Sequence, residues 1–300
     1  MLWLPIIIFA YFIFAVTSLI DKYLLTGPPN PKSYAFYVGV LGISALVLVP
    51  FVGFSVPETS QILLALSAGA IFIFAFFWFY TGLENFEASK IVPAIGGILP
   101  LFTFGLVYLL SGRQEILGGK EIFAFFLLIS GSVLIALERK RGITLGSLKV
   151  SVIAAFFFSL AFVFSKYVYL GQPFWSGFIW MRIGGFLAAL CFLLTKAVRE
   201  EIFLRKFTFQ KKTGTLFLFN QGMGAGGFIL QNFAIALVGL AYLPFINALQ
   251  GIQYVFLFLI IIFLARKFPR IVEEKLTKKN ILQKVISIAL IGLGLIILYF

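Results

Sequence analysis

The sequence predicts an all-α integral membrane protein with ten transmembrane helices, arranged as two inverted five-helix repeats. Three observations favour this fold class. Hydrophobic residues make up 61% of the 300 residues and the mean hydropathy is +1.07, whereas about half of an ordinary soluble protein is apolar. The charged residues, 12% of the chain, gather between apolar stretches of about 17–25 residues, the length of a helix that crosses a bilayer. Segments of the second half of the chain also repeat segments of the first half.

Ten apolar segments fit membrane-spanning helices. Lipid offers the backbone no hydrogen-bond partners, so a spanning segment is either a helix or a strand of a closed barrel. The unbroken apolar run 70–80 lacks the alternation of barrel strands. The first segment has neither a cationic start nor a small-residue cleavage site, so it is predicted to be a retained helix. The predicted helices are 2–20, 33–52, 60–82, 90–110, 121–137, 147–169, 174–195, 214–237, 240–264 and 283–300.

An internal repeat divides the chain into residues 1–140 and 141–300. The triplet 21–23 (Asp-Lys-Tyr) aligns with 165–167 (Ser-Lys-Tyr) at a shift of 144, and Gly97 aligns with Gly251 at a shift of 154. Each half then holds five predicted helices. Since five is odd, the second half must enter the membrane from the opposite side, and such inverted repeats commonly surround a central site.

Basic residues fall mostly on one side of the predicted membrane. The loops after helices one, three, five, seven and nine, with the adjoining helix ends, hold 20 Lys and Arg residues, and the other side holds 3. Because Lys and Arg collect on the cytoplasmic side, this bias predicts a multi-pass protein of the plasma (cytoplasmic) membrane with both termini outside. The net charge of +13 is assigned to anionic membrane lipids. No nucleic-acid partner is predicted, because the basic residues adjoin apolar spans and form no polar face.

The titratable residue types restrict the chemistry. The chain has no histidine and a single cysteine, Cys191. An intrachain disulfide is therefore excluded, a zinc or haem site is not expected, and no cofactor is predicted. The sequence also contains no P-loop and no acidic pair of the DxxxD kind, which argues against an ATP-driven motor and against an integral membrane enzyme.

Several motifs carry a resemblance to a known family. They are the segment 80–93 (Tyr-Thr-Gly-Leu-Glu-Asn-Phe-Glu-Ala-Ser-Lys-Ile-Val-Pro), followed by Leu-Pro at 99–100 and Ser-Gly-Arg at 111–113; the glycine-led segments 131–134 and 294–297; and Pro173 with Trp-Met-Arg at 180–182. Together they resemble the drug/metabolite transporter superfamily, in its ten-helix branch built from two EamA domains. The resemblance spans the whole chain and implies that each half is an EamA-like five-helix repeat. Two features depart from it: Val38 stands where the repeat would place a partner for Arg182, and relatives of this branch are usually drawn with both termini inside.

Arg182 is the one basic residue well inside a predicted span, about 12 Å from its start at 1.5 Å per residue. A charge at this depth costs about 2.5–3.5 kcal/mol on insertion scales, so it requires an explanation. One interpretation is that the guanidinium binds the carboxylate or phosphate of an anionic substrate by bidentate hydrogen bonds. The other is that it snorkels, or pairs with backbone carbonyls to lock two helices.

Two helices that correspond under the shift of 154 carry unusual faces. The helix 240–264 presents amide and hydroxyl side chains at positions i, i+3 and i+7, which lie on one face. The matching face of the helix 90–110 carries prolines and glycines, and proline frees a backbone carbonyl that a membrane tolerates only beside protein or water. These faces are predicted to line a shared cavity, the alternative being that the amides hold helices together. The residues are Asn247, Gln250, Gln253, Tyr254, Pro93 and Gly97.

Three further residues are candidates for the same cavity. Gln231 and Asn232 in the helix 214–237 are predicted to face it, whereas close helix packing explains the glycines of that helix. Trp78 is a candidate to stack on a substrate. Its alternative role is anchoring at the membrane interface or contact with lipid.

These features together predict a membrane transporter that moves a small-molecule solute across the membrane by alternating access through a central cavity. All eleven acidic residues lie at span ends or in loops, so facilitated diffusion, exchange or peripheral coupling is favoured over a proton path. The alternatives are a flippase for a lipid-linked headgroup and an integral membrane enzyme, which the residue types disfavour. Because two halves in one chain can enclose a cavity, the protein is predicted to function as a monomer.

Overall fold

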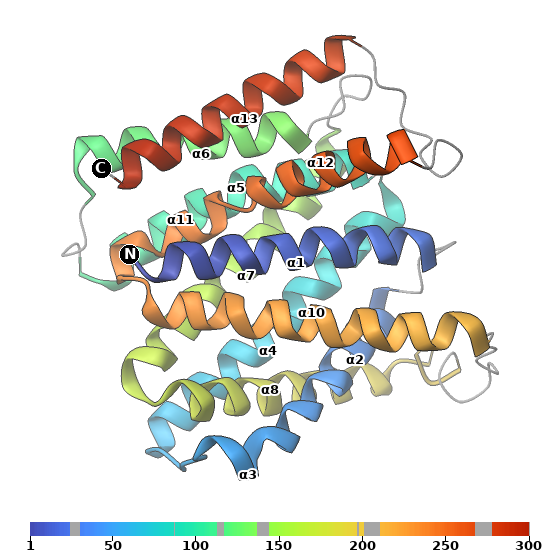
Figure 1. Ribbon diagram of the computed structural model, residues 1–300. Coiled ribbons are helices and arrows are strands. Elements are labelled where there is room, and N and C mark those ends of the chain that lie inside the picture. The colour runs from blue at the N-terminus through green and yellow to red at the C-terminus, as the bar shows by residue number, and fades with distance from the viewer. Residues whose placement is uncertain are drawn as a thin grey trace.

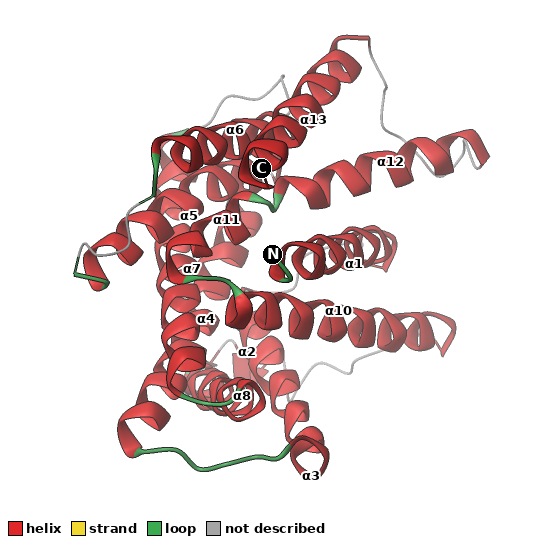
Figure 2. Cartoon of the chain, turned by 60° about the vertical axis from the view of Figure 1, so that its left-hand side comes forward, coloured by secondary structure: helices red, strands yellow, loops and turns green. Residues whose placement is uncertain are grey.

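The computed structural model describes residues 1–24, 31–86, 88–112, 117–136, 144–196, 198–200, 211–267 and 278–299. Within these ranges every regular element is a helix and none is a strand, as Figure 2 shows by colour. Helices cover all ten predicted segments (Figure 1). They are α1 (Trp3–Leu24), α2 (Pro31–Gly42), η1 (Ile43–Leu48), α3 (Val49–Val52), α4 (Thr59–Asn85), α5 (Ala88–Leu110), α6 (Gly119–Ala136), α7 (Leu145–Gly171), α8 (Phe174–Cys191), η2 (Phe192–Leu194), α10 (Lys211–Leu237), η3 (Leu240–Tyr242), α11 (Leu243–Ala248), α12 (Gly251–Lys267) and α13 (Lys278–Tyr299).

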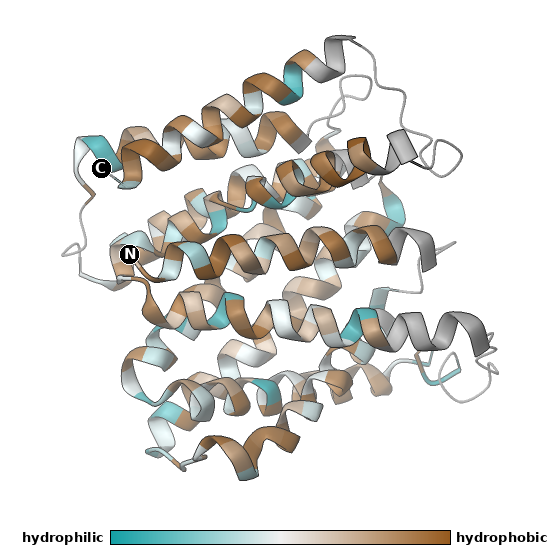
Figure 3. Ribbon diagram, viewed as in Figure 1, coloured by the Kyte–Doolittle hydropathy of each residue, from teal (hydrophilic) through white to brown (hydrophobic). Residues whose placement is uncertain are grey.

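Eight helical segments are long and apolar enough to cross a bilayer, which is typical of a multi-pass membrane protein. Large apolar side chains such as Phe51 and Phe263 are exposed along the helices, and Figure 3 shows hydrophobic residues along much of each helix. Among the described residues, α6 and α10 do not meet the same criteria of length and hydropathy. In α10 this is because amide residues and glycines interrupt the apolar sequence. The count of ten spans therefore stays a prediction, as does the side of the membrane that each terminus faces.

The N- and C-terminal ends of the chain lie at the same end of the bundle (Figure 1). Many of the basic residues that predicted the orientation lie outside the described residues, including 139–141, 205–206, 270 and 275. The same holds for Arg113 of the motif 111–113. The charge bias is thus a property of the sequence alone.

The antiparallel helices α6 and α13 pack side by side through a reciprocal contact (Figure 1). A Cβ atom built at Gly131 would lie 2.9 Å from the carbonyl oxygen of Ser287 and 2.7 Å from the Ile291 side chain. One built at Gly294 would lie 3.1 Å from the carbonyl oxygen of Ala124 and 2.8 Å from Leu128. Positions 124, 128 and 131 on α6 thus correspond to positions 287, 291 and 294 on α13, with the same difference in residue number for each pair. Two helices that exchange equivalent contacts in this way are related by a local two-fold axis.

Helices α4 and α8 approach until their backbones touch. A Cβ atom built at Gly69 would overlap the carbonyl oxygen of Met181, and one at Gly184 would overlap the backbone of Leu66. On α10, which is the third helix of the second half as α4 is of the first, the glycines are differently placed. In the described part of the chain, no atom of another element lies within 4 Å of a Cβ built at Gly222, Gly224 or Gly226. The two third helices are therefore packed unequally.

The segment 240–264, predicted as one helix, is interrupted between α11 and α12. The N–H of Gln250 donates to the carbonyl of Asn247, and the N–H of Ile252 donates to that of Leu249, so the bonds close one residue too early for an α-helix. The carbonyls of residues 246 and 248 lose their helical donors. Side-chain hydroxyls replace these donors, since Tyr11 donates to residue 246 at 2.6 Å and Ser132 to residue 248 at 2.7 Å. A break at this depth is stable because the surrounding helices satisfy it.

Candidate functional site

Arg182 extends from the middle of α8 into a box of phenylalanine rings. Its Cζ atom lies 4.4 Å from the ring centre of Phe228 on α10, 5.3 Å from that of Phe178 on α8 and 5.5 Å from that of Phe72 on α4. Aromatic faces attract a cation electrostatically, by about 2 kcal/mol or more where water is excluded. The rings therefore offset part of the free-energy cost of holding the charge inside the bundle.

Two small pockets flank the guanidinium, each with room for about one water molecule at about 10 Å³. Both are bounded by Arg182, Gly69 and Phe72. The first extends between α7 and α10 to Ser165 and Asn232, and the second extends along α2. Arg182 and Phe72 are thus the two side chains that border both spaces.

Polar groups from α7 and α10 meet at the first pocket. The hydroxyl of Tyr169 donates to Oδ1 of Asn232 at 2.9 Å, and Nδ2 of Asn232 donates to the carbonyl of Phe228 at 3.0 Å. The hydroxyl of Ser165 donates within its own helix to the carbonyl of Ala161. An amide carries two N–H donors and two acceptor lone pairs, so Asn232 keeps one of each for a further partner.

The charge of Arg182 has no anionic counterpart. Its Nε atom is buried without a hydrogen-bond partner, and within the described residues no carboxylate pairs with the guanidinium. The sequence explains this, because every acidic residue lies at a span end or in a loop. The rings supply attraction but no strong hydrogen-bond acceptor. The guanidinium, which borders both pockets, therefore retains at least one unused N–H donor, that of Nε.

A second polar cluster surrounds the break between α11 and α12. Nδ2 of Asn247 donates to the hydroxyl of Thr103 on α5 at 2.8 Å, and both residues are buried. Tyr11 lies within reach of the Gln231 side chain and near the hydroxyl of Tyr254. Of the predicted residues, this cluster brings together Asn247, Gln231 and Tyr254, and the pocket beside α7 brings together Arg182 and Asn232. Whether any of them binds a solute stays a prediction.

The other predicted residues lie apart from both pockets. Gln253 turns toward α1, where its Nε2 is 3.2 Å from the hydroxyl of Ser18, and Gln250 is half-buried at the helix break. Gly97 faces α6, since a Cβ built there would lie 2.6 Å from the Val133 side chain. Pro93 is buried in α5. Trp78 is half-buried further along α4, beside the ring of Phe77, and lines neither of the two pockets.

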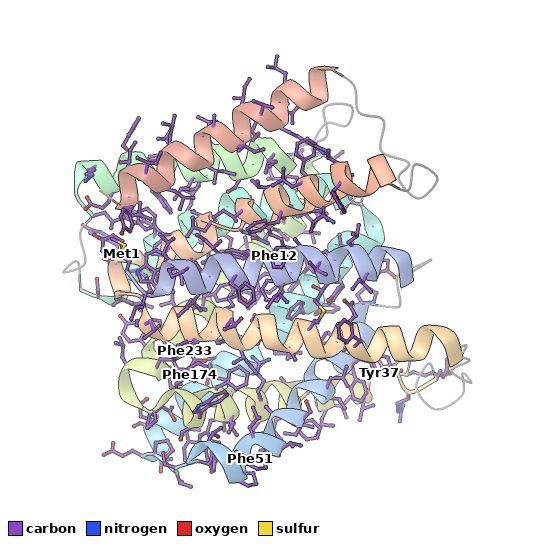
Figure 4. All side chains as sticks on the ribbon, in the orientation of Figure 1. Met1, Phe12, Tyr37, Phe51, Phe174 and Phe233 are labelled. Carbon is purple, nitrogen blue, oxygen red and sulfur yellow. The ribbon has the colours of Figure 1, made fainter. Side chains whose placement is uncertain are left out.

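Sequence reasoning missed the rings around Arg182 and the hydroxyls of Tyr169 and Tyr11. The chain has 39 phenylalanines, so no local pattern marks the three that contact the guanidinium. It also missed the buried Lys166, whose Nζ donates to the carbonyl of Ala236 at 2.8 Å. A cation near a helix C-terminus interacts favourably with the last carbonyls, and Lys166 thereby anchors the end of α10 to α7. Near this end of α10, Phe233 also packs against Phe174 at the start of α8 (Figure 4), with ring centres 5.2 Å apart.

Comparison with solved structures finds chains of the same architecture. One, described as "Crystal structure of protein", aligns over 97% of this chain and 94% of its own length, with a TM-score of 0.65 and 16% sequence identity. The fold is shared. At this identity the likeness establishes the fold alone. No model of a known protein family and no curated protein matches the chain.

The helix break offers a test of the second cluster. We expect Tyr11→Phe to lower the free energy of unfolding by about 1–2 kcal/mol, because the carbonyl of Ile246 loses its donor while the ring stays in place. Thermal unfolding in detergent micelles measures the change. Tyr108→Phe is the matched control, because the Tyr108 side chain is exposed near the end of α5, and it should leave the melting temperature unchanged. Equal effects of the two substitutions would contradict the assigned hydrogen bond.

Proposed function

We propose that this protein is a membrane transporter that moves a small solute by alternating access, through a cavity centred on Arg182 and Asn232. The observation that carries the proposal is the uncompensated guanidinium in the interior of a bundle of apolar helices. Ionisable groups inside a membrane bundle are costly and generally mark a path for a substrate or an ion. Here the group adjoins an amide with unused hydrogen-bonding capacity and two pockets.

The proposal includes two inverted repeats, residues 1–140 and 141–300, of the kind found in the EamA branch of the drug/metabolite transporter superfamily. The reciprocal contact of Gly131 and Gly294 supports it, because these glycines belong to the two segments that were aligned as closing helices of the halves. Antiparallel helices related by a two-fold axis are what inverted repeats place at their junction. The sequence motifs remain the argument for the family itself.

Unequal packing of the two third helices supports alternating access. Gly69 on α4 is closed against α8, while Gly222, Gly224 and Gly226 on α10 face open space. If the halves exchange conformations, α10 closes against its own neighbour α2 as α4 opens from α8. A site between the halves is then exposed to one side at a time, which is the usual mechanism of transporters with inverted repeats.

Solute-dependent stabilisation tests the function. Detergent-solubilised protein is screened by thermal unfolding against amino acids, sugars, nucleotides and their phosphates, because a ligand that binds only the folded state raises its stability. A solute that stabilises the protein is then followed into proteoliposomes by counterflow. We expect Asn232→Ala to lower the initial rate of uptake by about tenfold, corresponding to about 1.4 kcal/mol, because the amide lines the pocket.

Gln283→Ala is the matched control, because this amide donates to the carbonyl of Leu134 at the contact of α13 with α6, away from the pockets. Uptake should persist in it. Translocation of a lipid-linked headgroup without uptake of any soluble solute would replace the proposal with the flippase alternative. Chemical conversion of a solute would replace it with the enzyme alternative.

A further inference from the structure

The surroundings of Arg182 also restrict what the cavity binds. Resting on the transport function proposed above, we infer that the substrate is a small monocarboxylate with a flat apolar body, whose carboxylate binds the guanidinium of Arg182. Three features of the site support this inference: its charge, the number of charges it can balance, and the shape of its lining.

The site requires an anion. Arg182 is the ninth residue of the 21-residue span that begins at Phe174, too deep for a carboxylate from either span end to reach. Its Nε has no partner, and the rings of Phe72, Phe178 and Phe228 cannot accept the N–H bonds as a carboxylate does. Carboxylates bind guanidinium by two parallel charge-assisted hydrogen bonds. A bound carboxylate would also neutralise the charge of Arg182.

The site balances a single negative charge. Arg182 is the only cationic residue that lines either of the two pockets in the described structure. The neighbouring Lys166 is committed to the carbonyl of Ala236. A phosphate monoester, which carries close to two charges at neutral pH, would keep one of them unpaired among phenylalanine rings, and burying an unpaired charge is strongly unfavourable. A monoanion fits, whereas a dianion does not.

The lining selects the rest of the ligand. Beside the guanidinium, the first pocket is bounded by Phe72, Phe162 and Phe228, with Ala68 and Met181 completing its apolar part. Aromatic rings pack favourably against a planar apolar group, and the remaining N–H of Asn232 is available as a second donor to the ligand. The present pocket admits about one water molecule, so entry of a ligand requires the helices around Arg182 to move apart.

Binding of small probes to the full purified chain tests the inference. We choose benzoate as the flat monocarboxylate, with benzyl alcohol and benzylamine as its neutral and cationic counterparts, phenyl phosphate as the dianion, and acetate as the carboxylate without a ring. Binding to detergent-solubilised protein at pH 7.5 is measured by calorimetric titration and by thermal unfolding, which avoids passive leakage of the acid through a bilayer. We expect benzoate to bind at least about tenfold more tightly than each of the other probes.

Variants assign the binding to the guanidinium. Arg182→Met should weaken benzoate binding by at least about tenfold, and Arg182→Lys should restore only part of it, because an ammonium group lacks the planar fork. Lys196→Met is the matched control, since it removes a basic side chain that is 84% exposed at the end of the bundle and pairs with Glu200. A monodisperse elution profile and an unchanged helical circular-dichroism spectrum establish that each variant is folded.

Other outcomes separate this inference from the transport proposal. Benzoate binding that persists in folded Arg182→Met, or equal affinity for benzyl alcohol, overturns the carboxylate assignment. The same holds if no monocarboxylate binds at millimolar concentration. If proteoliposomes then accumulate a neutral or cationic solute, and Arg182→Met leaves that uptake intact, the transporter proposal stands without the anion. Absence of both solute binding and solute uptake overturns the two together.

Discussion

Gly69→Leu is expected to abolish uptake and to lower the free energy of unfolding by about 2–3 kcal/mol. Even the first atom of the new side chain would overlap the carbonyl oxygen of Met181 and lie 2.7 Å from the backbone N of Gly185. Backbone atoms cannot turn aside as a flexible side chain can, so α4 and α8 must separate, and overpacking of this kind typically costs about 1–3 kcal/mol or more. The separated helices can no longer close one side of the proposed cavity. Thermal unfolding in micelles and counterflow in proteoliposomes measure the two effects.

Gly105→Leu controls for the change of residue type, since a Cβ at Gly105 meets open space; both stability and uptake should persist. Gly224→Leu distinguishes a loss of transport from a loss of folding. Its side chain also meets open space in this structure, so the melting temperature should hold, yet uptake should fall if α10 closes against α2 in the other state. Full uptake in Gly224→Leu would contradict that closure.

The second large effect is expected at the helix break. We expect Gly251→Val to destabilise the protein by about 2–6 kcal/mol, because two costs combine. A Cβ at Gly251 would overlap the hydroxyl of Ser132, so α6 must shift, at about 1–3 kcal/mol. The displaced hydroxyl no longer donates to the carbonyl of Ala248, and an unsatisfied buried carbonyl costs about 1–3 kcal/mol. Thermal unfolding in micelles gives the sum.

Two further variants separate these costs. Ser132→Ala removes the donor without adding bulk, so it should show the smaller loss, about 1 kcal/mol. Gly292→Val places the same β-branched side chain where a Cβ meets open space in α13, and we expect little change. A loss in Gly292→Val as large as that in Gly251→Val would assign the effect to helix propensity and remove the packing explanation.

The helical segments were predictable because the length of each apolar stretch can be determined from the local sequence. Each predicted segment corresponds to helix in the described structure, with bounds that differ by a few residues. The break after Ala248 was not predictable in the same way. No proline occurs there, and its stability depends on hydroxyls from Tyr11 and Ser132, which are distant in sequence. The local pattern had suggested one continuous helix. Contacts with distant parts of the chain instead stabilise a break in it.

Within the candidate site, the sequence identified only the residues that are costly to place inside a membrane span. Arg182 stood out in the sequence because a charge inside a span is rare, and Asn232 because an amide pair interrupts an apolar helix. The rings of Phe72 and Phe228 carried no such signal among 39 phenylalanines. Gly97 illustrates the opposite case, because the sequence suggested an opening in the helix whereas the structure places it against Val133. Small residues indicate that another segment approaches closely, but the sequence does not identify that segment.

Both chain ends lie at the same end of the bundle (Figure 1), which restricts the number of times that the chain can cross the membrane. A polypeptide returns to its starting compartment only after an even number of passages, so, with the eight long apolar helices taken as spans, α6 and α10 either both traverse the bilayer or both stop short of it. An antibody against an epitope tag would therefore reach a tag at Met1 and a tag placed after Tyr299 from the same compartment, whichever compartment that is.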